Sequence, residues 1–197
     1  MSEPQGFLAI WSDVSETDRT DYLHWLTREH VEERLSVPGF LAARVFRARL
    51  PDVNRYFILY ELREAAVVGS APYLARLNNP TPWSKRIMGR VTNFKRGGGA
   101  IVSRTGFGYG GLILPTILQK KPLAADGGTP LPDHICSITL MATDAAQTQI
   151  PTAEKGLRSG DNSFAGLSVT EGFDERALLA ATIGKPNEPV YETVFAR

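Results

Sequence analysis

His30 and Arg34, one helical turn apart, form the pair in this sequence that is best suited to acid–base chemistry. They lie in a segment that begins with possible N-cap residues at 15–18 and is predicted to be helical to about residue 35. At about 100° per residue, both side chains project from the middle of the apolar stripe of this helix, toward a sheet. An imidazole there can exchange a proton near neutral pH, and a guanidinium can hold a carboxylate or an enolate.

A structural role for the same pair is the alternative. His30 would then be a buried histidine that is hydrogen-bonded to backbone or to Glu61, and Arg34 would form an ion pair at the edge of the apolar stripe. The residue types alone do not separate the two roles.

Two tyrosines of a predicted strand at residues 55–62 extend the candidate site. Tyr56 and Tyr60 share one face of this strand because side chains alternate with period two. We expect Tyr60 to donate a hydrogen bond to a developing oxyanion and Tyr56 to contact the substrate. Packing of both rings, each with one satisfied hydroxyl, is the alternative.

Two further side chains complete the predicted binding residues. Arg44 and Arg47 lie on opposite faces of a predicted strand at residues 40–50, so at most one of them lines a cleft, and Arg47 is the predicted one. Trp83 follows prolines in a predicted stiff loop at residues 79–83, where it is either a lid over the site or a cover for the core.

Neither a metal nor an organic cofactor is expected. His24 and His30 diverge on the helical wheel, and His134 lies in the other half of the chain, so a zinc or iron site is not predicted. Residues 106–111 (GFGYGG) match G-x-G-x-x-G literally, but an apolar strand-like run follows where that dinucleotide motif requires a helix. We interpret them as a flexible junction. Cys136 lies in an apolar run and is expected to pack as a small hydrophobic residue.

The order of predicted elements is β-α-β-β-α-β, twice. In the first half the strands are expected at residues 7–13, 40–50, 55–62 and 91–103, with helices at 15–35 and, broken by Gly69 and Pro72, at 63–77. The three glycines at 97–99 are interpreted as a bulge or bend. This order is that of a ferredoxin-like unit, whose sheet leaves one apolar face uncovered.

The second half repeats this order less clearly. Strands are predicted at residues 111–118, 134–143, 164–172 and 189–197, with a helix at 174–183, and Pro115 would confine the first of them to an edge or bulge. Residues 119–133 contain three prolines and two glycines, so the first helix of this half is missing. The predicted domains are residues 1–104, with the pocket, and residues 105–197.

Composition excludes several classes of function. Lys+Arg of 22 against Asp+Glu of 21 gives a net charge of +1, so no global field favours nucleic acid or an acidic membrane surface. The sequence lacks a signal peptide and a run of about 18 apolar residues, so a cytoplasmic protein is expected. A homodimer is compatible with the sequence but is not required by it.

Residues 25–40 (WLTREHVEERLSVPGF) resemble the Trp…Glu-His…Pro-Gly-Phe signature of dimeric α/β-barrel proteins of the EthD-like kind, and residues 79–83 resemble a loop of uncharacterised members. The resemblance is good over residues 7–95 and faint afterwards. It implies an α+β fold in which two tandem ferredoxin-like halves pack sheet to sheet as an intrachain dimeric α/β barrel. It also implies a cleft between helices and sheet for a small apolar or aromatic ligand, with His30 at the position of a family histidine.

The resemblance covers many activities, including muconolactone-type isomerases, polyketide cyclases, cofactor-free monooxygenases, aldoxime dehydratases, dye-decolorising peroxidases and chlorite dismutases. The leading hypothesis is an isomerase, cyclase or lyase without organic cofactor, acting on a small apolar or aromatic carbonyl compound, lactone or enol. A non-catalytic ligand-binding or accessory protein is the second hypothesis. A cofactor-free monooxygenase or haem-binding member is the third.

Overall fold

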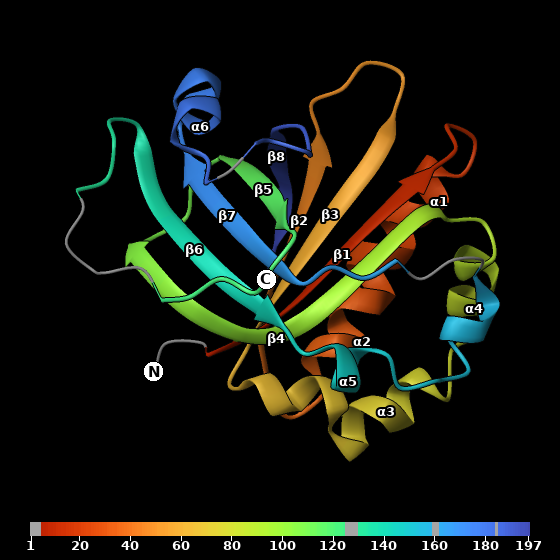
Figure 1. The fold of residues 1–197 in the computed structure, drawn as a ribbon. Coiled ribbons are helices and arrows are strands. Elements are labelled where there is room, and N and C mark those ends of the chain that lie inside the picture. Colours follow the sequence, from red (N-terminus) through yellow and green to blue (C-terminus); the bar gives the residue numbers. More distant parts are fainter. Residues whose placement is uncertain (1–4, 125–129, 159–161, 184) are drawn as a thin grey trace.

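The computed structural model describes residues 5–124, 130–158, 162–183 and 185–197. Its strands form one closed barrel in the order β1-β3-β2-β8-β5-β7-β6-β4 (Figure 1). The strands are β1 Gly6–Val14, β2 Phe40–Ala48, β3 Asn54–Leu62, β4 Thr92–Gly106, β5 Leu112–Leu118, β6 Ile135–Thr143, β7 Gly166–Gly172 and β8 Tyr191–Ala196.

The helices are short and lie outside the barrel. Helix α1 (Arg19–Trp25), a π-helical turn η1 (Leu26–His30) and α2 (Val31–Leu35) form one continuous element, which confirms the predicted first helix. The others are η2 (Ala65–Gly69), α3 (Ala71–Leu77), α4 (Pro82–Met88), α5 (Ala145–Thr148), η3 (Lys155–Leu157) and α6 (Glu175–Ala181). Figure 1 shows α1 to α4 gathered on one side of the barrel, with α6 on the opposite side.

The barrel closes through strand edges. The first four strands are adjacent in the order β4-β1-β3-β2, and the last four have the corresponding order β8-β5-β7-β6. Strand β2 pairs with β8, and β4 pairs with β6, all antiparallel. The two sets of strands were expected to pack as two sheets. Instead they pair with each other at both edges and form one continuous hydrogen-bonded wall.

Strand alternation separates two cores. The barrel interior is aromatic and aliphatic, with Phe7, Trp11, Phe46, Phe57, Leu59 and Tyr191 among its buried residues. The outer face of β1, β2, β3 and β4 packs against the helices, with Leu8, Ile10, Val45, Tyr56, Ile58 and Tyr60 among its members. The candidate site belongs to this outer layer, between wall and helices.

Several sequence predictions need correction or refinement. Residues 79–83 are not a stiff loop throughout, because Thr81 caps α4 by accepting a hydrogen bond from the Ser84 N–H. Gly97 to Gly99 form no bulge with β1, where their pairing is regular. Close packing explains why glycine occurs here, because a Cβ on Gly97 would lie 2.4 Å from the Phe164 ring.

The helix predicted at residues 63–77 in the first half is broken, as expected, into η2 and α3.

The order of elements in the second half agrees with the prediction. The helix predicted at residues 174–183 is present as α6. Pro115 lies in the part of β5 that β8 does not pair, as a strand-edge position requires. Residues 119–124 and 130–133 contain no helix, and the rest of the predicted helix-free segment lies outside the described residues.

No helix among the described residues is both long enough and apolar enough to cross a membrane. After Gly106, residues 107–111 lead directly into β5 without a helix, so the G-x-G-x-x-G match has no dinucleotide-binding context.

Candidate functional site

A small enclosed cavity lies between the helices and the outer face of the barrel wall. Its volume is ≈ 20 Å³, roughly the space of one water molecule. Its lining comes from β1, β3 and β4, from the helices α1 to α4 and from the connection between β6 and β7: Ile10, Ser12, Tyr22, Trp25, His30, Arg34, Ile58, Tyr73, Met88, Val91, Phe94, Arg96, Glu154 and Arg158.

His30 ends the π-helical turn and is 2% exposed. Single π-helical turns are frequent at functional sites. Its ring lies against Trp25 with centroids 4.2 Å apart, and its Nδ1 is buried without a hydrogen-bond partner. Burial and the positive charges of Arg34 and Arg158 lower the pKa of His30 well below its usual 6.5. The imidazole is therefore neutral at pH 7 and able to accept a proton.

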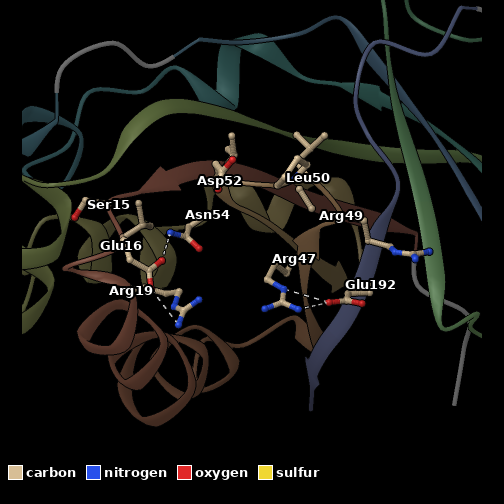
Figure 2. Close-up of a pocket in the computed structure, with 13 residues that line it drawn as sticks. Ser15, Glu16, Arg19, Arg47, Arg49, Leu50, Asp52, Asn54 and Glu192 are labelled. Atoms are coloured by element: carbon tan, nitrogen blue, oxygen red, sulfur yellow. Dashed lines mark hydrogen bonds and ion pairs between the residues drawn. The ribbon is translucent and has the colours of Figure 1, made fainter.

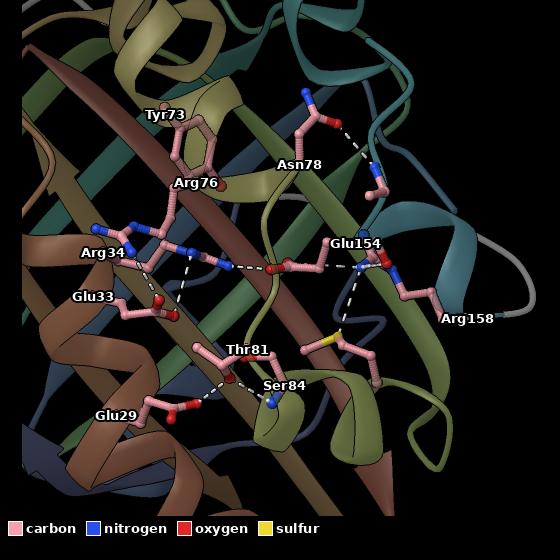
Figure 3. A network of polar contacts seen from close by, with 12 residues as sticks. Glu29, Glu33, Arg34, Tyr73, Arg76, Asn78, Thr81, Ser84, Glu154 and Arg158 are labelled. Carbon is pink, nitrogen blue, oxygen red and sulfur yellow. Dashed lines mark hydrogen bonds and ion pairs between the residues drawn. The ribbon is translucent and has the colours of Figure 1, made fainter.

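Arg34 is 1% exposed and is held by a residue from the other half of the chain. Its Nη2 donates to Glu154 Oε2, while Glu33 Oε2 lies 3.9 Å from Nη1 (Figure 3). Nη1 itself has no hydrogen-bond partner. Arg34 is thus ion-paired within the buried layer, not at the edge of the helical stripe, and it retains a free donor.

Two further arginines line the cavity. The Arg158 guanidinium lies 3.8 Å from the Phe94 ring centroid, and its Nη1 donates to the Glu154 carbonyl at 3.4 Å. Arg96 is 5% exposed, and donates to the Thr148 carbonyl at 2.7 Å and to the Tyr73 hydroxyl at 3.2 Å. The lining carries three guanidinium groups and one carboxylate.

Tyr60 lies in the same buried layer but does not line the cavity. Its hydroxyl has no hydrogen-bond partner, and burial raises its pKa far above the usual 10, so the hydroxyl keeps its proton. The nearby Arg34 partly offsets this rise. Tyr60 is therefore placed as a proton-bearing neighbour of the site, packed edge-on against Phe40 at 5.4 Å.

The remaining predicted site residues lie elsewhere. Tyr56 and Arg47 line a separate surface cavity of ≈ 370 Å³ beside Leu23 and His24. Arg47 is exposed and forms an ion pair with Glu192, at 2.5 Å. Trp83 packs in the first turn of α4 and donates from Nε1 to Asp21 at 3.0 Å. The structure thus places His30 and Arg34 in the cavity lining, Tyr60 in the same buried layer outside the lining, and Tyr56, Arg47 and Trp83 elsewhere.

A larger groove of ≈ 800 Å³ opens at the β2–β3 turn, as Figure 2 shows. It contains Arg47, Arg19 and Arg49, but each of them is paired with a carboxylate: Glu192, Glu16 and Glu175 respectively. These exposed pairs balance their own charge in solvent, so the groove lacks the buried, incompletely bonded groups that distinguish the His30 cavity.

Sequence reasoning missed Glu154, Arg158 and Tyr73. Glu154 and Arg158 lie in the connection between β6 and β7, for which the pattern of apolar residues predicts no role. Arg96 was not predicted as a site residue either. One feature of the sequence could have identified Glu154 and Arg158. Their spacing of four positions places opposite charges one helical turn apart.

Among the described residues, no group of three or more His, Cys, Asp or Glu side chains is placed to hold a metal ion. Cys136 is partly buried, and burial raises the pKa of its thiol above the usual 9. That environment disfavours the thiolate that a nucleophile requires.

Comparison with known proteins establishes the fold. No protein-family model and no curated protein matches the chain. Among solved structures, an anthrone oxidase-like protein is similar with a TM-score of 0.60 and 8% identity, over 100% of this chain and 93% of that chain. A mutant chlorite dismutase from Candidatus Nitrospira defluvii, in complex with cyanide, has a TM-score of 0.43 and 10% identity, over 98% and 91%. The first likeness shows an α+β barrel of the dimeric α/β-barrel fold.

Proposed function

We propose that the chain is an enzyme without organic cofactor that transfers a proton within a small apolar or aromatic carbonyl compound, lactone or enol. One observation carries this proposal: a fully buried, neutral histidine with an unpartnered Nδ1 lies beside a buried arginine with an unpartnered Nη1. Unpartnered polar groups in a buried cavity are costly unless a ligand or water completes them.

The reaction follows from the protonation states. Neutral His30 accepts a proton from the carbon next to a carbonyl, and the electron pair of that C–H bond moves onto the carbonyl oxygen. Arg34 stabilises the resulting enolate by charge, and the protonated Tyr60 hydroxyl would support it from the same layer. Return of the proton to a different carbon completes an isomerisation and restores the neutral imidazole.

The finer classification is also a proposal. We infer two tandem ferredoxin-like halves, residues 1–104 and 105–197, of the EthD-like kind. The support is the equal strand order of the two sets of four strands and the His30-containing signature helix. The name of the anthrone oxidase-like neighbour refers to anthrone, an aromatic ketone, and compounds of that kind fall within the proposed substrate class.

A non-catalytic ligand-binding protein is the second candidate, favoured by the small cavity. A volume of ≈ 20 Å³ admits no organic molecule until side chains move, and binding without turnover would meet that description. A haem does not fit, because the ≈ 20 Å³ cavity beside His30 would have to enlarge by far more than a small ligand requires. We therefore derive no step through a haem.

Solvent exchange tests the enzyme proposal directly. Wild-type protein is incubated in D2O with 2-tetralone, an aryl-activated ketone, and deuterium incorporation next to the carbonyl is followed by NMR. We expect exchange above the buffer rate in the wild type and at least a hundredfold loss in His30→Gln, in line with removal of a general base. His24→Gln, which changes a histidine outside the cavity, is the control.

Equal exchange in wild type and His30→Gln would contradict the role of His30. Binding of the ketone without any exchange would favour the ligand-binding candidate instead.

A further inference from the structure

We propose that the ligand of the His30 cavity is a small organic anion, an aromatic compound with a carboxylate, and that this carboxylate takes the place of Glu154 on Arg34. The inference rests on the proposed function in that it takes this cavity as the ligand site. It adds the charge of the ligand and the residue that the ligand must displace.

Arg96 supplies the first observation. It is 5% exposed, and it forms no ion pair with any carboxylate of the described residues. Its guanidinium donates hydrogen bonds to two neutral groups, the Thr148 carbonyl and the Tyr73 hydroxyl. A buried guanidinium without a counterion is unfavourable, and an anionic ligand would supply that counterion.

Arg34 supplies the second observation. Both Arg34 and Arg96 lie with Cζ 5.8 Å from the Tyr73 ring centroid, so two buried positive charges share one aromatic neighbour. Arg34 Nη2 is bound by Glu154, but Nη1 is unpartnered. A ligand carboxylate that replaces Glu154 on Nη2 forms a charge-assisted hydrogen bond there and leaves Nη1 to hold the enolate of the proposed reaction.

Glu154 is a resident carboxylate that lies outside the barrel strands. It precedes the single turn η3 in the connection between β6 and β7, and is not part of a barrel strand. Two hydrogen bonds tie this stretch to the end of α3: Glu154 N donates to the Leu77 carbonyl at 2.9 Å and Ala153 N donates to Asn78 Oδ1 at 3.0 Å. Because the cavity holds only about one water molecule, a ligand has to displace this side chain.

A second cavity shares a lining residue with the first. It has a volume of ≈ 330 Å³, and the described residues of its lining include Arg96, Thr148 and Lys155 and no carboxylate. Arg96 lines both cavities, and we infer that a ligand reaches the site of His30 past its guanidinium. An entrance lined by positive side chains attracts anions and disfavours cations.

The test compares benzoate with benzamide, which has nearly the same shape and no charge, by isothermal titration calorimetry at low salt. We expect benzoate to bind the wild type at least tenfold more tightly than benzamide does. In Glu154→Gln the benzoate affinity rises at least tenfold, because the resident competitor has lost its charge, while benzamide affinity is unchanged. Glu175→Gln, which breaks the exposed Arg49–Glu175 pair between the halves, leaves both affinities as they are.

Arg96→Met keeps the test decisive if Glu154→Gln does not fold. It removes the uncompensated charge, and benzoate affinity then falls at least tenfold with benzamide unaffected. Equal binding of benzoate and benzamide to the wild type overturns the inference. Weaker benzoate binding by a folded Glu154→Gln overturns it as well.

The two proposals fail in different ways. If benzoate binding depends on Glu154 as expected but His30→Gln retains full exchange of 2-tetralone, the proposed function fails and the anion site stands. If exchange requires His30 while benzamide binds as tightly as benzoate, the anion site fails and the proposed function stands.

Discussion

Two buried arginine–glutamate pairs join the first half of the chain to the second, and they differ in how completely they are bonded. At one end of the barrel interior, Arg44 binds Glu171 through both terminal nitrogens, at 2.7 and 3.0 Å. In the layer outside the wall, Arg34 binds Glu154 through Nη2 alone and leaves Nη1 without a partner.

The surroundings of the two pairs also differ in how completely their polar groups are bonded. The Tyr109 ring covers Arg44 at 3.9 Å, and the Gly110 N–H donates to Glu171, so only Nε of Arg44 is left unpartnered. Beside Arg34 are a cavity and the unpartnered Nδ1 of His30. Arg44 and Glu171 thus satisfy each other in a filled space, whereas the incomplete Arg34–Glu154 pair lies beside the cavity that we propose as the ligand site.

The largest expected effect comes from removing one charge from each pair in turn. Glu171→Gln leaves the 6%-exposed Arg44 without its bidentate partner, so the free energy of unfolding should fall by about 3–5 kcal/mol. Glu154→Gln should lower it by only about 1–3 kcal/mol, since Glu154 binds one nitrogen of Arg34 whereas Glu171 binds two nitrogens of Arg44. Each arginine keeps a second carboxylate at 3.9 Å, Glu33 beside Arg34 and Glu61 beside Arg44. Urea unfolding of both variants measures the difference. Equal losses would remove the distinction between the pairs.

An effect of intermediate size is expected from pH. The pKa of His30 is lowered from 6.5 in the folded protein, so the folded state binds fewer protons than the unfolded state below that pH. The free energy of unfolding should therefore fall as the pH drops below about 6.5, by at most about 1.4 kcal/mol per pH unit from this residue.

His30→Gln should remove this part of the pH dependence. Urea unfolding at pH 7, 6 and 5 of wild type and variant tests the prediction, with His24→Gln as the matched control. A variant that loses stability between pH 7 and 5 as steeply as the wild type would show that His30 is not the group responsible.

The smallest expected effect concerns the cover of the barrel pair. Tyr109→Phe removes two hydrogen bonds from the tyrosine hydroxyl to Glu61, at 3.0 and 2.8 Å, and keeps the ring over Arg44. We expect a loss of about 0.5–1.5 kcal/mol in thermal or urea unfolding, because the residue is half exposed. Benzoate binding at the His30 cavity should not change. A change there would mean that the two regions are coupled.

Much of the local structure was predictable because it depends on neighbouring residues. The stripe of the first helix placed His30 and Arg34 toward the sheet, and alternation placed Tyr56 and Tyr60 on the same face of their strand. The stiff loop at residues 79–83 was wrong because a Thr–Pro pair also starts a helix, with Thr81 as its cap.

The junction at residues 106–111 also shows how far local sequence patterns can predict the structure. Residues 106–111 were correctly separated from a dinucleotide site, but local composition does not predict that Tyr109 stacks on Arg44. That contact depends on the closure of the barrel, which brings the junction over the end of β2.

The sequence by itself determined the order of strands and helices and the buried positions of His30 and Arg34, because periodicity acts over a few positions. It also determined that residues 119–124 and 130–133 form no helix, because helix-breaking residues act locally. Only the tertiary structure decided which charges meet. Arg34 and Glu154 are separated by 120 positions, and Arg44 and Glu171 by 127. Their partnership depends on how the barrel closes, which no local pattern of residues encodes.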